Sequence, residues 1–107
     1  MTNEVGVVLD KNGYAPSVVD PFSELDKRCF LCNYRGDLVR HEIFNASNRQ
    51  KSKAYGLWVY LCPRCHMEVH DHPNLQLKRI AQWNAMAWYS WTIEDFRERF
   101  GKNYVEV

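Results

Sequence analysis

The chain has 107 residues, of which 46% are hydrophobic and 25% are charged, and its formal net charge is +1. This length predicts one small soluble domain, and the near-neutral charge excludes a global field that attracts nucleic acid, so such binding would need a local basic patch. No apolar run approaches the roughly 20 residues of a membrane-spanning helix, and the start, MTNEVGVVLDKNG, lacks the pattern of a signal peptide. We therefore expect a protein of the reducing cytoplasm without a membrane segment.

The first part of the chain predicts an irregular N-terminal arm over residues 1–24, because NG, AP and DP dipeptides interrupt it. Residues 25–107 then predict one domain. Within it, β-forming residues favour strands over 38–44 and 57–61, and the polar stretch NASNRQKSKAYG between them predicts a loop.

Helices are expected after the second strand. Pro63 suits the first turn of a short helix over residues 63–72, and Pro73 interrupts it. From about residue 74, apolar residues recur near i, i+3, i+4 spacing, broken once by Asn84, which predicts a longer helix.

A final helix has recognisable ends. Thr92 and Asp95 form a capping box with Asp in place of Glu, and Gly101 follows the last apolar residue. The whole pattern predicts an α+β fold in which a zinc-stapled hairpin and helix precede C-terminal helices.

The four cysteines form two C-x-x-C pairs, Cys29 with Cys32 and Cys62 with Cys65. Two such pairs supply the tetrahedral sulfur shell that structural Zn²⁺ prefers, and the helix that begins at the second pair favours thiolate. The alternatives are redox disulfides or inert buried thiols. A redox role is disfavoured because one C-x-x-C beside a βαβ unit is expected there, and no such unit is present. We therefore expect a structural zinc ion.

Histidines remain after the sulfur shell is complete. His66 and His70 are four residues apart on the short helix, so their rings lie on one face. His41 and Glu42 are neighbours on the first strand and point to opposite faces of it. If the hairpin packs on the helix, three imidazoles could hold a second ion with an open position, as catalytic metal sites do. The alternative is ordinary surface histidines, of which His72 is one more.

This pattern resembles the HNH, or ββα-metal, nucleases that carry a four-cysteine treble-clef zinc site. The matching residues are the first C-x-x-C, then HEIF at 41–44, then LWVYLCPRCHMEVH at 57–70. The chain is similar in particular to small HNH-like proteins of bacteriophages and prophages, and the resemblance extends from Cys29 to about Tyr104.

The resemblance implies roles for individual residues. His41 takes the position of a metal ligand, and His66 and His70 take those of the helix ligands. Glu42 takes the position of the general base, where the family has histidine. The family's middle asparagine is missing from the start of the second strand, and Asn48 is the nearest substitute. The resemblance thus implies a catalytic divalent ion (Mg²⁺, Mn²⁺ or Zn²⁺) and an endonuclease. Glu42 leaves three alternatives open: a poorer base that gives slow nicking, a metal ligand, or a site that has lost its chemistry.

The stretch between the strands also holds Arg49, Lys51 and Lys53 without an acidic residue. Beside the expected metal, these side chains predict phosphate contacts to DNA with little sequence preference, although an ordinary solvated loop is the alternative.

Aromatic residues are frequent near the C-terminus. They are expected to clamp the helices onto the hairpin, with a spare ring or two available for a homodimer contact. The members are Trp83, Trp88, Tyr89, Trp91 and Phe96.

The sequence leaves three functions open. The preferred one is a metal-dependent HNH-type endonuclease of phage origin that cleaves or nicks DNA in a bacterial host. The second is a treble-clef zinc module that binds nucleic acid or a phage or host protein without cutting. The third is an inhibitor that shares the scaffold.

Overall fold

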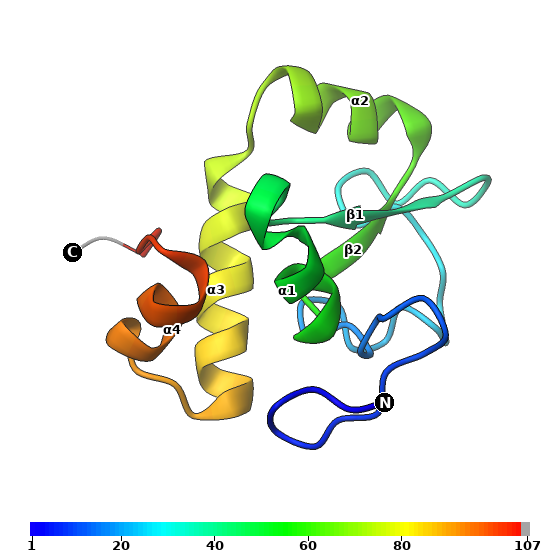
Figure 1. Ribbon diagram of the computed structural model, residues 1–107. Coiled ribbons are helices and arrows are strands. Elements are labelled where there is room, and N and C mark those ends of the chain that lie inside the picture. The colour runs from blue at the N-terminus through cyan, green and yellow to red at the C-terminus, as the bar shows by residue number, and fades with distance from the viewer. Residues whose placement is uncertain (106–107) are drawn as a thin grey trace.

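An antiparallel hairpin of two short strands organises the chain in the computed structural model, which describes residues 1–105. α2 lies on one side of this hairpin and the N-terminal residues lie on the other (Figure 1). The fold is α+β, as expected. The elements are β1 (Val39–Glu42), the 3₁₀ turn η1 (Ala46–Asn48), α1 (Arg49–Ala54), β2 (Trp58–Leu61), α2 (Pro63–Asp71), α3 (Leu75–Tyr89) and α4 (Ile93–Phe100).

The two faces of the hairpin have different partners. Val59 and Leu61 of β2 belong to the hydrophobic core, whereas Trp58 and Tyr60 contact the N-terminal residues. His41 pairs with Val59 in the register of the two strands. Because side chains alternate along a strand, His41 shares the core face with Val59. Arg40 and Glu42, the neighbours of His41 in β1, lie on the opposite face.

The N-terminal arm, residues 1–24, packs against the rest of the fold although it is irregular. Val18 and Val19 are buried in the core, and the Val18 N–H donates to the Gly56 carbonyl over 2.9 Å. The Trp58 indole N–H donates to the Ala15 carbonyl over 2.8 Å. The proline and glycine residues of the arm prevent regular structure without preventing burial.

The polar stretch between the strands differs from its prediction. It forms η1 and the short helix α1 rather than a loop. Ser52 is fully buried, and its hydroxyl donates to the Phe44 carbonyl over 2.6 Å while accepting the Phe44 N–H over 3.0 Å. This pair of hydrogen bonds ties α1 to the end of the first strand, and the polar composition concealed it.

The C-terminal helices follow the predicted pattern. The capping box of Thr92 and Asp95 is present, and Gly101 ends α4 with a positive φ of 81°. Asn84, which breaks the apolar spacing of α3, donates to the carbonyls of Val18 and Val19 and so holds the arm. None of the described helices has both the length and the hydropathy that crossing a bilayer requires.

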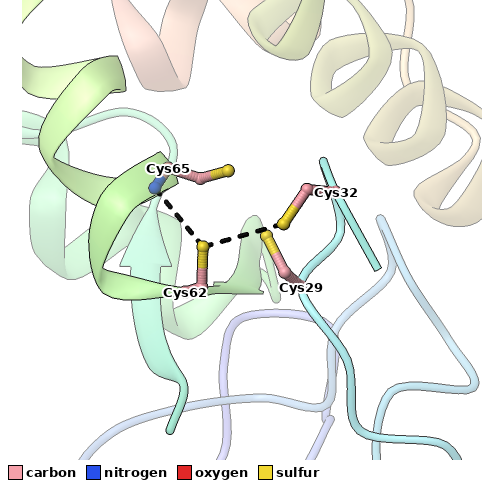
Figure 2. Close-up of side chains that lie close together, drawn as sticks. All are labelled: Cys29, Cys32, Cys62 and Cys65. Atoms are coloured by element: carbon pink, nitrogen blue, oxygen red, sulfur yellow. Dashed lines mark hydrogen bonds between the residues drawn. The ribbon is translucent and has the colours of Figure 1, made fainter. Parts of the chain in front are cut away.

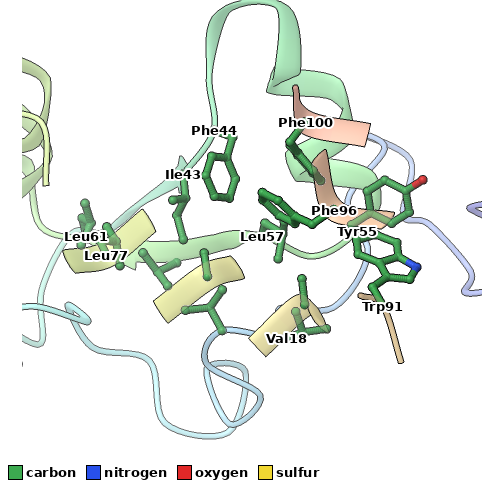
Figure 3. Close-up of a cluster of buried hydrophobic side chains, with 14 of the residues drawn as sticks. Val18, Ile43, Phe44, Tyr55, Leu57, Leu61, Leu77, Trp91, Phe96 and Phe100 are labelled. Atoms are coloured by element: carbon green, nitrogen blue, oxygen red, sulfur yellow. The ribbon is translucent and has the colours of Figure 1, made fainter. Parts of the chain in front are cut away.

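The core lies where the hairpin, α3 and α4 meet (Figure 3). Trp91 and Phe96 are buried in it, as expected, whereas Trp83 and Trp88 are 54% and 58% exposed and do not join the clamp. The core side chains labelled there are Val18, Ile43, Phe44, Tyr55, Leu57, Leu61, Leu77, Trp91, Phe96 and Phe100.

Gly56 permits the close approach of the arm to β2. Its φ is +73°, and a Cβ at this position would clash with the Pro16 carbonyl oxygen. We expect Gly56→Ala to destabilise the protein by about 3 kcal/mol or more, because the backbone of the arm must move. Gly6→Ala is the matched control, since Gly6 also has a positive φ but open space around it, and it should cost only about 1–2 kcal/mol. Chemical denaturation of the two variants measures the difference; equal losses would contradict the clash.

Candidate metal centres

Four free cysteines gather where the 29–32 turn meets the start of α2 (Figure 2). Cys62 is the N-cap of α2 and accepts the Cys65 N–H at 3.4 Å. The sulfur atoms of Cys29, Cys32, Cys62 and Cys65 all lie within 4.8 Å of one another. The two C-x-x-C pairs are thus brought together, as the spacing predicted.

The sulfur cluster fits a tetrahedral zinc ion. Zn–S bonds of about 2.3 Å place the sulfur atoms of a tetrahedral site roughly 3.8 Å apart. The Cys32 and Cys62 sulfur atoms are 3.7 Å apart. The four cysteines can therefore hold a metal ion such as zinc.

The pKa values of two of these thiols shift in opposite directions, that of Cys29 downward and that of Cys65 upward. Burial opposes ionisation of Cys29, but backbone N–H groups of Cys62, Cys32 and Leu31 outweigh it and lower the pKa of the Cys29 thiol to about 7. Burial, together with hydrogen bonds to the other three thiols, raises the pKa of Cys65 to about 12. Four thiolates cannot coexist this closely without a cation, and a bound metal deprotonates its thiol ligands.

Three histidines form a second cluster. His41 of β1 faces His66 and His70 of α2, with ring centroids 5.3 and 5.6 Å from its own. The Nε2 atoms of His66 and His70 are 3.1 Å apart. Tetrahedral Zn–N bonds of about 2.0–2.1 Å would place such nitrogens roughly 3.3 Å apart. One ligand nitrogen from each ring lies within 4.8 Å of the others, so these side chains fit one ion.

The histidine cluster is separate from the sulfur cluster among the residues that the structure describes. No imidazole completes the sulfur shell. The convergence of the three rings agrees with the sequence interpretation, and the physical reason is the i, i+4 spacing on α2 above the core face of the hairpin.

Burial favours the neutral form of the His41 and His66 imidazoles. His41 is only 6% exposed. This burial, with smaller contributions from His66 and His70, lowers the pKa of His41 to about 4. Burial and His70 also lower the pKa of His66. Neutral imidazole is the form that binds a metal.

An open recess of about 650 Å³ adjoins the histidine cluster. This volume is within the range of sites that accept nucleotide-sized ligands. The recess is lined by the three histidines together with Asn12 and Tyr14 of the arm, Val39, Arg40 and Glu42 of β1, Asn45 and Arg49. A smaller recess of about 130 Å³ on the other side includes His41, His70, Asn45 and Lys78.

Glu42 does not join the histidine cluster. It accepts hydrogen bonds from Tyr14 at 2.5 Å and from Arg49 at 2.8 Å. Burial opposes ionisation of its carboxyl, but these two partners and the Lys53 charge outweigh burial and hold the pKa below its usual value. A carboxylate with a lowered pKa and both oxygen atoms engaged is a poor proton acceptor.

Two of the three predicted DNA-binding residues, Arg49 and Lys53, lie near Glu42, and Lys51 is directed elsewhere. Arg49 lines the recess, but the Lys51 ammonium donates to the Arg99 carbonyl over 2.6 Å and Lys53 lies 4.8 Å from the Tyr14 ring centre. Arg49 and Lys53 are four residues apart on α1 and so lie on the same face of the helix, near Glu42, whereas Lys51 lies on another face. Arg49 pairs with an acidic residue that lies outside the basic stretch 45–56, namely Glu42.

The asparagine that lines the histidine recesses is Asn45 and not Asn48. The Asn48 side chain donates to the Phe100 carbonyl over 3.0 Å and does not line either histidine recess, whereas Asn45 lines both. Asn45 follows HEIF directly, so its position in the sequence was a usable signal. Nothing in the sequence placed Tyr14 beside the histidines, because it lies in an arm without regular structure.

Comparison with known proteins does not assign the chain to a family. No protein-family model matches it, and no curated protein or solved structure matches it significantly. The function therefore has to be inferred from the two clusters and the recess.

The sulfur cluster should be essential for folding. We expect Cys29→Ser to lose bound zinc and cooperative thermal unfolding, because a structural zinc ion contributes on the order of 10 kcal/mol of apparent folding free energy in small domains. Zinc content by elemental analysis and melting by circular dichroism measure both effects. A variant that melts cooperatively at the wild-type temperature would contradict a structural ion.

The histidine cluster should bind a second ion without supporting the fold. We expect His70→Ala to bind one zinc ion per chain instead of two and to keep its melting temperature, because His70 is exposed. His72→Ala, which removes a neighbouring histidine outside the cluster, should keep both ions. Calorimetric zinc titration gives the stoichiometry, and two ions in the His70 variant would refute the second site.

Proposed function

We propose that this protein is a metal-dependent, HNH-type endonuclease of phage origin that cleaves or nicks DNA. The observation that carries the proposal is the cluster of three imidazoles beside an open recess, separate from a four-sulfur cluster. Catalytic metal sites keep such an open position, whereas structural sites are closed.

The order of the elements supports the same family. A C-x-x-C turn, the hairpin and a helix that begins with the second C-x-x-C follow one another, an order that favours a treble clef. The ββα unit of the resemblance is then β1, β2 and α2, with His41 on the first strand and His66 and His70 on the helix.

The chain's own residues would divide the work. His41, His66 and His70 would hold a divalent ion, which when bound supplies a Lewis acid that polarises the phosphoryl group and neutralises charge on the leaving oxygen. Burial of His41 keeps its ring neutral and fixed by the hairpin. Arg49 would contact the phosphate backbone from the rim of the recess.

A second function is favoured by the state of Glu42. Because its carboxylate is engaged by Tyr14 and Arg49, the strand offers no free general base, as expected of a module that binds DNA or a protein partner without cutting. Both functions share the two metal sites and differ in catalysis.

Cleavage of supercoiled plasmid separates the two functions. We expect wild-type protein to nick the plasmid with Mg²⁺ or Mn²⁺ and not with EDTA, and we expect His70→Ala to lose at least about 100-fold of this activity, the scale of a lost catalytic metal contact. His72→Ala should remain active. Equal background cleavage by wild type and His70→Ala under all conditions would leave only the binding module.

A further inference from the structure

A carboxylate links the N-terminal arm to the rim of the histidine recess. Glu42 receives the Tyr14 hydroxyl on one oxygen and the Arg49 Nε–H on the other. Only 12% of the Glu42 side chain is exposed, against 58% of the Arg49 side chain. A mostly buried anion thus has an exposed cation as its partner.

The Arg49 guanidinium keeps its outer donors available. Among the described residues, Arg49 interacts through its side chain with Glu42, by an Nε hydrogen bond, and with the nearby Tyr14 hydroxyl, so most of the N–H groups of its two Nη atoms are left for a ligand. The Arg49 side chain lines the same recess as the three histidines. A planar fork with free donors matches two oxygen atoms of a phosphate.

Arg40 has a different task, although it also lines the recess. Its guanidinium lies 4.4 Å from the Tyr14 ring centre and 4.7 Å from that of Trp58, and it pairs with Asp10 at 3.1 Å. These contacts engage Arg40 and hold the Tyr14 ring in place. Arg49, whose side chain is 58% exposed against 28% for Arg40, is therefore the arginine that is accessible to a ligand at the recess.

We propose that Tyr14 and Glu42 are positioning residues that orient the Arg49 guanidinium to bind a DNA phosphate beside the histidine cluster. This rests on the proposed function and assigns Glu42 a role other than the general base. The arm thereby becomes part of the substrate site. An exposed ion pair alone adds little stability, so folding does not explain why a mostly buried carboxylate and a tyrosine hydroxyl hold an exposed arginine.

The charge of the site agrees with this assignment. The Glu42 carboxylate is paired with Arg49 and hydrogen-bonded by Tyr14, so a phosphate approaching the rim meets a guanidinium rather than a bare carboxylate. Glu42→Gln keeps an oxygen acceptor for the Arg49 Nε–H, whereas Arg49→Lys loses the fork.

The experiment measures binding and cleavage separately. Binding of a short fluorescent DNA duplex is followed at low salt with EDTA concentrations that leave the structural zinc in place, and nicking is followed with Mn²⁺. We expect Arg49→Lys to raise Kd about tenfold, the effect of one lost charge-assisted hydrogen bond, and Tyr14→Phe to raise it about threefold. In both variants KM should rise more than kcat falls.

Matched controls separate position from chemistry. Arg97→Lys alters another exposed arginine, paired with Glu94 at 2.6 Å on α4, and Tyr60→Phe removes another tyrosine hydroxyl that donates to a carboxylate, Glu24. Both should keep the wild-type Kd and KM. Melting temperatures of all variants show that the fold is retained.

Glu42→Gln decides between anchor and base. As an anchor, it should keep kcat within about tenfold and keep the acid limb of the pH–rate profile, whereas loss of a general base costs roughly 10²–10⁴-fold and removes that limb. A large loss of kcat at unchanged Kd would overturn the positioning role and leave the nuclease intact.

The other outcomes are also distinct. If Arg49→Lys and Tyr14→Phe bind DNA like their controls, or if wild type does not bind the duplex, the phosphate site is refuted. If both variants weaken binding while wild type cuts nothing, the phosphate site stands and the nuclease function fails.

Discussion

The sulfur cluster is the constraint on which the rest of the structure depends. Cys62 and Cys65 occupy the first turn of α2, and the 29–32 turn supplies the other two sulfur atoms, so one ion would fix both the start of the helix and its direction across the hairpin. A chain of this size has a modest core, and the close thiols disfavour this arrangement unless a cation is present. The positions of His66 and His70 are then fixed as well, because they lie one and two turns further along the same helix.

The alternation of side chains along β1 divides the site into two parts. His41 points to α2 and the core, and Glu42, the next residue, points to the arm. Burial favours the neutral form of His41, while hydrogen bonds from Tyr14 and Arg49 favour the ionised form of Glu42. His41 and Glu42, which are neighbours in the sequence, therefore face different parts of the fold. This is the physical basis for proposing a metal-binding role for His41 and a positioning role for Glu42.

The N-terminal arm connects these surroundings. It has no helix or long strand, yet Ser17 accepts and donates hydrogen bonds within the fold, and Val18 and Val19 complete the core. Tyr14 reaches the recess because these neighbours hold the backbone in place. An irregular segment thus has a defined position, since burial and hydrogen bonding rather than secondary structure fix it.

The sequence by itself determined the features that depend on short spacing. The two C-x-x-C pairs, the His66–His70 pair and the Thr92–Asp95 capping box each lie within one turn, where local geometry sets the distance between groups. Tertiary structure alone decided the rest. The buried hydrogen bond from Ser52 to Phe44 ties the polar helix α1 to the end of the first strand. Glu42 pairs with Arg49 of that helix, and Tyr14 of the arm donates a hydrogen bond to the same carboxylate. Those partners are distant in sequence or hidden by polar composition, so only the packing of the hairpin between arm and helices brings them together.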